Sequence, residues 1–425
     1  MDNKVYNAYV SLLRNELTMA TGCTEPIAIA YAGAKLREVL GVVPEHCSVY
    51  CSGNMVKNVM AVTVPNSDGG KGIELAAVLG IVGGDASLDL DVLSPVTPED
   101  ISLAKQLVAS GCCDTELVEG VANLYVRIEA SKGDQTALVE IKEYHRNITR
   151  IEKNGEVLLS EEKKANADAE SADLKKYLNV KDILAFADEV NVDDIKEVLK
   201  RQIDCNLAIS EQGLKGGWGA EVGKTIVESA EKLSLREKAM AYAAAGSDAR
   251  MNGCPLPVVI NSGSGNQGIT VSMPIHVYAS EYGIDEDRVI RALAVANLIS
   301  LHQKKYIGSL SAYCGAVSAG TASACGIAWM LGNGYDVIAK IITNSINTTG
   351  GMVCDGAKSS CASKIATAVG MALIAYEMAV RGRCFLPGEG LVEDELEATI
   401  ASVGRMGRVG MKSTDVEILN IMLGK

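Results

Sequence analysis

The chain has 425 residues and carries 53 acidic against 40 basic side chains, a formal net charge of −13. This acidic balance argues against a broad phosphate-binding face, and so against nucleic acid as the main partner. Hydrophobic residues make up 48% of the chain and charged residues 22%, as in a folded globular protein, and the length favours two domains.

The chain is rich in thiols, with 12 cysteines. Its N-terminal residues lead into a helix that carries Arg14 and Glu16 rather than an apolar signal segment, so we expect a cytoplasmic protein. Because thiols stay reduced in that compartment, the cysteines point to metal binding or catalysis rather than to disulfides.

The first part of the chain predicts helices and short strands. A helix extends to about Met19, a turn holds Cys23, and a second helix covers residues 27–40. Residues 48–51 and 59–64 have the apolar, β-branched character of strands.

A helix start and a meander follow. Thr97 as N-cap and Pro98 at the first helical position begin a helix that ends near Gly111. Alternating apolar and polar residues, with an Asn154-Gly155 turn, predict an antiparallel meander. Its strands are expected at residues 124–129, 136–144, 148–153 and 156–159.

The run at residues 160–173 is polar, contains no large apolar side chain and marks the predicted domain boundary. We therefore predict an α+β fold. A mixed α/β domain that contains the meander covers residues 1–160, a linker covers 161–175, and a mainly helical catalytic domain covers 176–425. The N-terminal helices and Cys23 are expected to pack on the helical domain.

Helix signals continue in the second half. Ser234 and Glu237 form a capping box, and Asp285 begins a helix that continues through Leu298. Residues 306–335 carry no charge and are long enough to span a bilayer. Their serines, threonines and glycines favour a buried helix pair instead.

Three cysteines near the C-terminus lie among glycines. Cys314, Cys354 and Cys361 are separated by 40 and 7 residues and have no obvious fourth ligand. Thiolates bind iron well, and a set of three leaves one metal position open, as in a catalytic centre. The alternative is that they are buried small hydrophobic side chains. Cys325 would lie about 16 Å from Cys314 along a helix and is assigned to the core.

Cys23 lies between Gly22 and Thr24, just before a predicted helix. Backbone amides at a helix N-terminus lower the pKa of a thiol, so Cys23 is predicted to be a reactive thiolate that faces the metal site. Glu25 either tunes this thiol or simply occupies the first helical turn. An inert buried cysteine is the alternative.

Residues 261–268 are rich in glycine and contain the G-x-G-x-x-G spacing of dinucleotide sites. A helix should then begin at once, but residues 269–273 look extended and end at Pro274. We favour a nest of backbone amides that binds a small carboxylate, with a simple turn as the alternative. The substrate-binding residues predicted here are Asn261, Ser262, Gly263 and Asn266.

Lys304 and Lys305 lie just before the uncharged run. They either neutralise a substrate carboxylate or form a solvated helix end, and we add them to the predicted substrate site. His46, His145 and His276 have no motif around them and are assigned structural roles.

Five stretches carry a resemblance to known proteins. They are residues 21–26 (Thr-Gly-Cys-Thr-Glu-Pro), 52–57 (Ser-Gly-Asn-Met-Val-Lys), 302–305 (His-Gln-Lys-Lys), 309–315 around Cys314, and 350–361. In these stretches the chain resembles a bacterial family that carries a serine dehydratase alpha-chain-like domain and includes archaeal and bacterial L-cysteine desulfidases. The similarity runs nearly end to end.

The resemblance implies a [4Fe-4S] cluster held by Cys314, Cys354 and Cys361 with one iron open, and we take Cys23 as the catalytic base. The expected reaction is α,β-elimination on a small amino acid, converting L-cysteine to pyruvate, ammonia and sulfide. By this resemblance, iron-dependent serine dehydratases have a longer gap between their last two cysteine ligands, so the seven-residue gap between Cys354 and Cys361 favours a desulfidase.

Three other interpretations stay open: an L-serine dehydratase with the same site, a pyridoxal phosphate enzyme, and a non-catalytic iron- or thiol-sensing binding protein. The expected partner is a small amino-acid substrate. We expect neither nucleic acid nor a membrane as a partner, and a homo-oligomer is left open.

Overall fold

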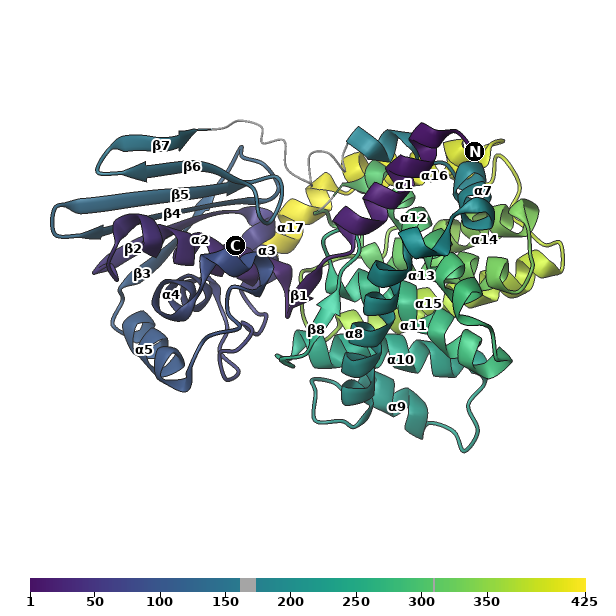
Figure 1. Cartoon of the computed structure of the whole chain (residues 1–425), viewed down its shortest axis with the longest axis horizontal. Coiled ribbons are helices and arrows are strands. Elements are labelled where there is room, and N and C mark those ends of the chain that lie inside the picture. The colour runs from purple at the N-terminus through teal and green to yellow at the C-terminus, as the bar shows by residue number, and fades with distance from the viewer. Residues whose placement is uncertain (161–172, 309) are drawn as a thin grey trace.

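The computed structural model describes residues 1–160, 173–308 and 310–425. Figure 1 shows a smaller lobe built on a sheet beside a larger helical lobe, which confirms the predicted α+β class. Residues 161–172 of the predicted linker lie outside the described residues.

The strands of the smaller lobe are β2 (His46–Ser52), β3 (Cys113–Val118), β4 (Tyr125–Lys132), β5 (Gln135–Lys142), β6 (Ile148–Lys153) and β7 (Glu156–Ser160). They form one sheet in the order β3-β2-β4-β5-β6-β7. Strands β4 to β7 are the predicted antiparallel meander, whereas β3 joins the other edge parallel to β2.

Three helices accompany the sheet: α2 (Thr24–Leu40) packs on β4 and β5, α4 (Ile73–Gly83) packs on α2, and α5 (Pro98–Ala109) packs on α4. The first two approach closely because a glycine faces a backbone carbonyl. A Cβ at Gly80 would lie 2.1 Å from the carbonyl oxygen of Ala30, so no larger residue fits there.

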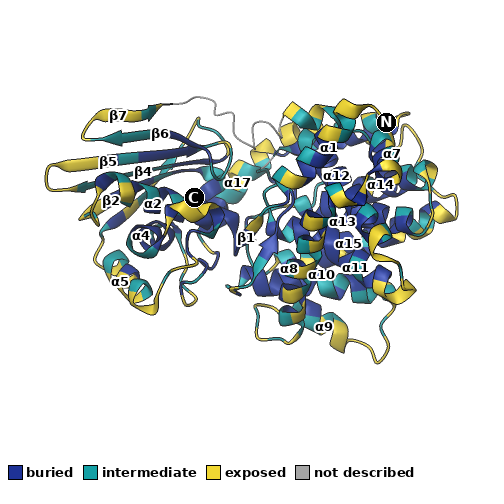
Figure 2. Cartoon of the chain, viewed as in Figure 1, coloured by how far each residue is buried: buried dark blue, intermediate teal, exposed yellow. Residues whose placement is uncertain are grey.

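The helices of the larger lobe are α7 (Val180–Glu189), α8 (Lys196–Leu214), α9 (Val222–Glu228), α10 (Leu235–Met251), α11 (Gly265–Tyr282), α12 (Glu286–Ile307), α13 (Gly315–Met330), α14 (Tyr335–Thr349), α15 (Cys361–Val380) and α16 (Leu396–Arg405). Helix α13 is buried along nearly its whole length and packs against α11, α12, α14 and α15 (Figure 2). The helix pair predicted at residues 306–335 is therefore one helix preceded by a loop.

Both ends of the chain connect the two lobes (Figure 1). Helix α1 (Asn3–Glu16) packs on the helical lobe, against α12 and α7. The following strand β1 (Met19–Thr21) pairs antiparallel with β8 (Pro257–Val259). At the other end, α17 (Lys412–Met422) packs on α3 (Gly53–Val59) of the smaller lobe.

The structure has the predicted helix starts but not two of the predicted extended segments. The helix starts at Thr97 and Ser234 are confirmed, each with its capping box. The predicted strand at 59–64 is wrong, since α3 ends there and a turn follows. Residues 269–273 are also not extended, because α11 continues through Pro274. Both segments are rich in β-branched residues, and their tertiary surroundings override that local preference.

Helix α15 is long and apolar enough, by length and composition alone, to span a membrane. The core helix of a folded protein can have the same length and apolar composition. Half of its most apolar window is buried within the chain, where α15 packs against α10, α13 and α14.

Candidate active site

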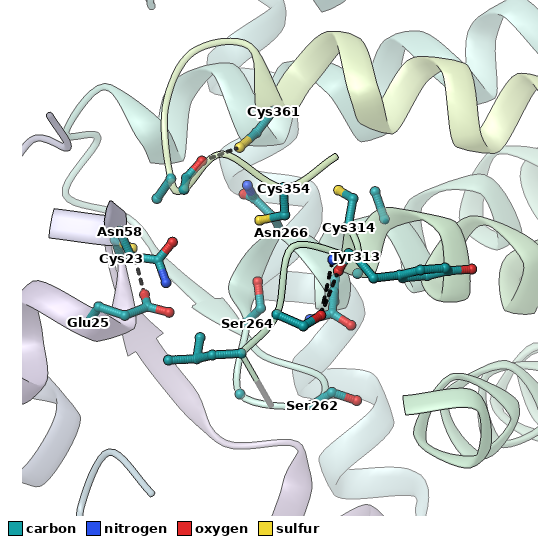
Figure 3. Close-up of a pocket in the computed structure, with 18 of the residues that line it drawn as sticks. Cys23, Glu25, Asn58, Ser262, Ser264, Asn266, Tyr313, Cys314, Cys354 and Cys361 are labelled. Carbon is teal, nitrogen blue, oxygen red and sulfur yellow. Dashed lines mark hydrogen bonds between the residues drawn. The ribbon is translucent and has the colours of Figure 1, made fainter. Parts of the chain in front are cut away.

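A cavity of about 110 Å³ lies where the start of α2 meets loops of the helical lobe (Figure 3). The three predicted metal ligands and the predicted base all border it, although they come from distant parts of the sequence. The predicted site residues that line the cavity are Cys23, Ser262, Gly263, Asn266, Lys304, Cys314, Cys354 and Cys361.

Two of the cysteines are tied together through their main chains. The N–H of Cys314 donates to the carbonyl of Met352 at 2.9 Å, and the N–H of Cys354 donates to the carbonyl of Ala312 at 2.7 Å. These bonds form a short antiparallel bridge between the two loops. Residues 40 positions apart in the sequence are thereby neighbours at one wall of the cavity.

The thiols of Cys314 and Cys354 influence each other. Their pairing lowers the pKa of Cys354 and, together with burial, raises the pKa of Cys314. The positive charges of Lys57 and Lys364 act in the same direction on Cys354. The protein therefore stabilises a negatively charged sulfur at this wall.

The third cysteine, Cys361, is the first residue of α15. Its thiol donates to the carbonyl of Gly356 at 3.7 Å (Figure 3), and the residue packs against a small apolar cluster of Cys23, Val62 and Met251. Cys325, in contrast, is fully buried within α13 and does not border the cavity, in keeping with its assignment to the core.

The cysteine side chains line one cavity but do not converge on a single position within it. Among the residues that the structure describes, no three His, Cys, Asp or Glu side chains are placed to ligate one metal ion.

Cys23 is the N-cap residue of α2, and its thiol donates a hydrogen bond to Oε2 of Glu25 at 2.9 Å (Figure 3). The predicted lowering of its pKa is wrong. Burial, reinforced by the negative charge of Glu25, raises the pKa of Cys23 well above its usual value, and Arg250 opposes this only in part. Cys23 is therefore a thiol in the resting protein.

Two further residues border the cavity: Glu25, for which the sequence left two roles open, and His145, which was assigned a structural role. Burial alone would raise the pKa of Glu25, but His145 and the Cys23 thiol outweigh it and lower the pKa to about 2. The distance from His145 Nε2 to Glu25 Oε1 is 3.9 Å, that of an ion pair rather than a hydrogen bond. Glu25 had a weak sequence signal, its place two residues after Cys23; His145 had none.

The loop before α11 presents polar groups to the cavity. Ser262 and Gly263 line it with φ angles of 52° and 76°, in the left-handed region that glycine adopts easily. The Oδ1 of Asn266, the Oε1 of Gln267 and the Nε of Arg250 are buried, and none has a hydrogen-bond partner among the described residues. Buried polar atoms of this kind at a cavity wall indicate a ligand-binding position.

Asn261 does not line the cavity. It is fully buried, and its Nδ2 donates to Oδ1 of Asn297 at 2.9 Å. Its own Oδ1 accepts hydrogen bonds from the hydroxyls of Ser262 and Ser300, each at 2.9 Å. Both polar atoms of the Asn261 side chain are thus hydrogen-bonded within the protein. Asn261 therefore holds the loop in place without facing the cavity.

Lys304 and Lys305 have different surroundings. Lys304 borders both the cavity and a neighbouring pocket of about 540 Å³, and burial lowers its pKa to about 8. Lys305 borders the outer pocket only and donates to the carbonyl of Leu178 at 2.7 Å. The two spaces also share His145, so this part of the wall separates the cavity from the outer pocket.

Comparison with known proteins agrees with this architecture. The family model named serine dehydratase alpha chain matches residues 88–420. The chain is 48% identical over 420 residues to the UPF0597 protein of Finegoldia magna, covering 98% of this chain and 99% of that protein. It is 44% identical over 427 residues to the UPF0597 protein of Treponema denticola, covering 100% and 99%. Since the family model covers most of the chain, the protein belongs to the serine dehydratase alpha-chain family.

Proposed function

We propose that the protein is an iron–sulfur-dependent lyase that carries out α,β-elimination on L-cysteine, giving pyruvate, ammonia and sulfide. Its family points to a lyase of the serine dehydratase type. The observation that carries the proposal is the meeting of Cys23 with the three cysteines Cys314, Cys354 and Cys361 at one small cavity. Elimination requires a base near Cα and stabilisation of the leaving group, and these thiols can provide both.

We propose that the three cysteines hold a [4Fe-4S] cluster. They border one cavity, and three thiolate ligands would leave one iron without a protein ligand. Lys57 and Lys364 already favour a thiolate at Cys354. When bound, the cluster supplies an iron Lewis acid for the leaving sulfur. The ligands must remain thiols, so a reducing cytoplasmic setting is part of the proposal.

Cys23 is proposed as the base, with Glu25 as its partner. Cys23 takes the Cα proton only after it has passed its own proton on. The ionised carboxylate of Glu25, which accepts the S–H hydrogen bond, is placed to receive that proton. The transfer is unfavourable in the free protein, because burial and Glu25 raise the pKa of Cys23, and Arg250 opposes them only in part. A substrate ammonium group closer to Cys23 than to Glu25 would favour the transfer.

The remaining polar groups suit a zwitterionic amino acid. Lys304 and the Nε of Arg250 are donors for its carboxylate. The Oδ1 of Asn266 and the Oε1 of Gln267 are acceptors for its ammonium group. Asn261 contributes by holding the loop that carries Asn266. The small volume of the cavity favours a short side chain.

The test is anaerobic purification, reconstitution with iron and sulfide, and incubation with L-cysteine, L-serine and other β-substituted amino acids. We expect about four irons per chain, with pyruvate and sulfide released fastest from L-cysteine. A preference for L-serine would make the protein a serine dehydratase. Iron binding without pyruvate from any amino acid would favour a sensing protein and overturn the proposal. A yellow absorption band shifted by substrate would indicate pyridoxal phosphate.

A further inference from the structure

A buried ion pair connects the two lobes beside the cavity. Lys57, in α3, forms an ion pair with Asp415 of the C-terminal helix α17. The Lys57 side chain is 1% exposed and that of Asp415 is 14% exposed. Removing either partner would leave a buried charge without compensation, which is strongly unfavourable.

The same lysine holds a predicted metal ligand. Its Nζ donates to the carbonyl of Cys354 at 3.3 Å. The main chain of Lys57 also touches the segment that follows, because a Cβ at Gly356 would lie 2.3 Å from the carbonyl oxygen of Lys57. Gly356 has a φ of 95°, so both its conformation and its contact exclude a larger residue. Gly356 in turn accepts the hydrogen bond of Cys361.

We propose that Lys57 and Asp415 are positioning residues, which together form a strap that fixes the loop between Cys354 and Cys361. Asp415 holds the ammonium group of Lys57, and Lys57 holds the carbonyl of Cys354. Without the strap, the loop keeps its main-chain bridge to Ala312 but loses the hydrogen bond from the Lys57 side chain of the smaller lobe. The description of these cysteines as cluster ligands rests on the proposed function.

The test compares three variants, Lys57→Met, Asp415→Asn and the double variant Lys57→Met/Asp415→Leu. Hydrogen–deuterium exchange of residues 351–358 is measured in the metal-free protein, and iron per chain is measured after reconstitution. We expect exchange about tenfold faster or more in this segment, and iron content reduced to half or less. The double variant leaves no unpaired buried charge, so it folds even where a single variant does not.

The matched control is Glu140→Gln. Glu140 is a buried carboxylate of the sheet that accepts hydrogen bonds from Tyr125 and Thr149 and does not border the cavity. This variant is expected to lower the unfolding temperature without changing loop exchange or iron content, which separates positioning from general destabilisation.

Unchanged exchange in residues 351–358 of the double variant would overturn the strap, as would an equal increase in the Glu140→Gln control. If the wild-type protein takes up no iron, the proposed function fails. The exchange measurement in the metal-free protein still decides whether the strap holds the loop.

Discussion

The Cys23 sulfur lies 2.9 Å from Oε2 of Glu25, and both side chains are buried. The thiol donates and the carboxylate accepts, so the Cys23 proton already points at the group proposed to receive it. Burial and the charge of Glu25 both keep that proton on sulfur. The resting site therefore holds Cys23 as a thiol rather than a thiolate.

Cys23→Ser tests this role most directly. A serine hydroxyl loses its proton far less readily than a thiol, so we expect turnover to fall by roughly a thousandfold or more. Iron content and the brown absorption of the reconstituted protein should be unchanged, because Cys23 is not among the proposed ligands. Loss of iron in this variant would instead make Cys23 a ligand.

Alanine at Cys314, Cys354 or Cys361 is expected to lower iron content and abolish turnover, because each change removes one of three thiolate ligands. Cys325→Ala is the matched control. It removes a buried sulfur from α13 outside the cavity and should cost roughly 1 kcal/mol of stability while leaving iron content intact. Equal iron loss in all four variants would mean that the effect is one of folding.

Lys304→Met tests binding of the substrate carboxylate. Loss of a charge-assisted hydrogen bond at a buried position is expected to raise KM about tenfold to a hundredfold, with a smaller change in kcat. Lys305→Met is the control, since Lys305 faces the outer pocket and the carbonyl of Leu178. Steady-state kinetics with L-cysteine measures both. A fall in kcat with no change in KM would count against carboxylate binding by Lys304.

Asp248→Asn tests the pH dependence of stability. Burial raises the pKa of Asp248 to about 6, so the folded protein binds this proton more tightly than the unfolded chain. The stability it contributes is lost as pH rises from about 4 to about 6. Asparagine does not ionise, so the variant avoids the free-energy cost of a buried charged carboxylate. It should be more stable than the wild type at pH 8 by at most about 3 kcal/mol, and by less at pH 5.

Urea unfolding of both proteins at the two pH values checks this expectation. The hydrogen bond from the N–H of Gly223 to Oδ2 of Asp248, 2.9 Å long, can be kept by the asparagine oxygen. A variant that is less stable than the wild type at pH 8, or one whose gain is the same at both pH values, would contradict the assignment.

Part of the candidate site could be predicted because its signals are local. Glycines around Cys314 and Cys354 suggested loops that approach a ligand, and these cysteines do meet Cys23 at one cavity. The starts of helices at Thr97 and Ser234 were equally visible, since a capping box needs only four consecutive residues.

The rest depended on contacts between distant segments. His145 and Arg250 reach the cavity from different lobes, and no spacing in the sequence relates them. The pKa of Cys23 could not be predicted from its helix terminus, because burial and the orientation of Glu25 outweigh the effect of the backbone amides. The helix through Pro274 could not be predicted for a similar reason, because the surroundings of this segment in the core override its local preference.

The paired main-chain bonds between the loops of Cys314 and Cys354 have a mechanical consequence. Displacement of one loop carries the other with it, so the main-chain spacing of these two cysteines is set by the bridge between the loops. Cys361 stands apart at the end of a different helix. Movement of the site therefore alters the distance from Cys361 to the other two cysteines more readily than the main-chain spacing of that pair.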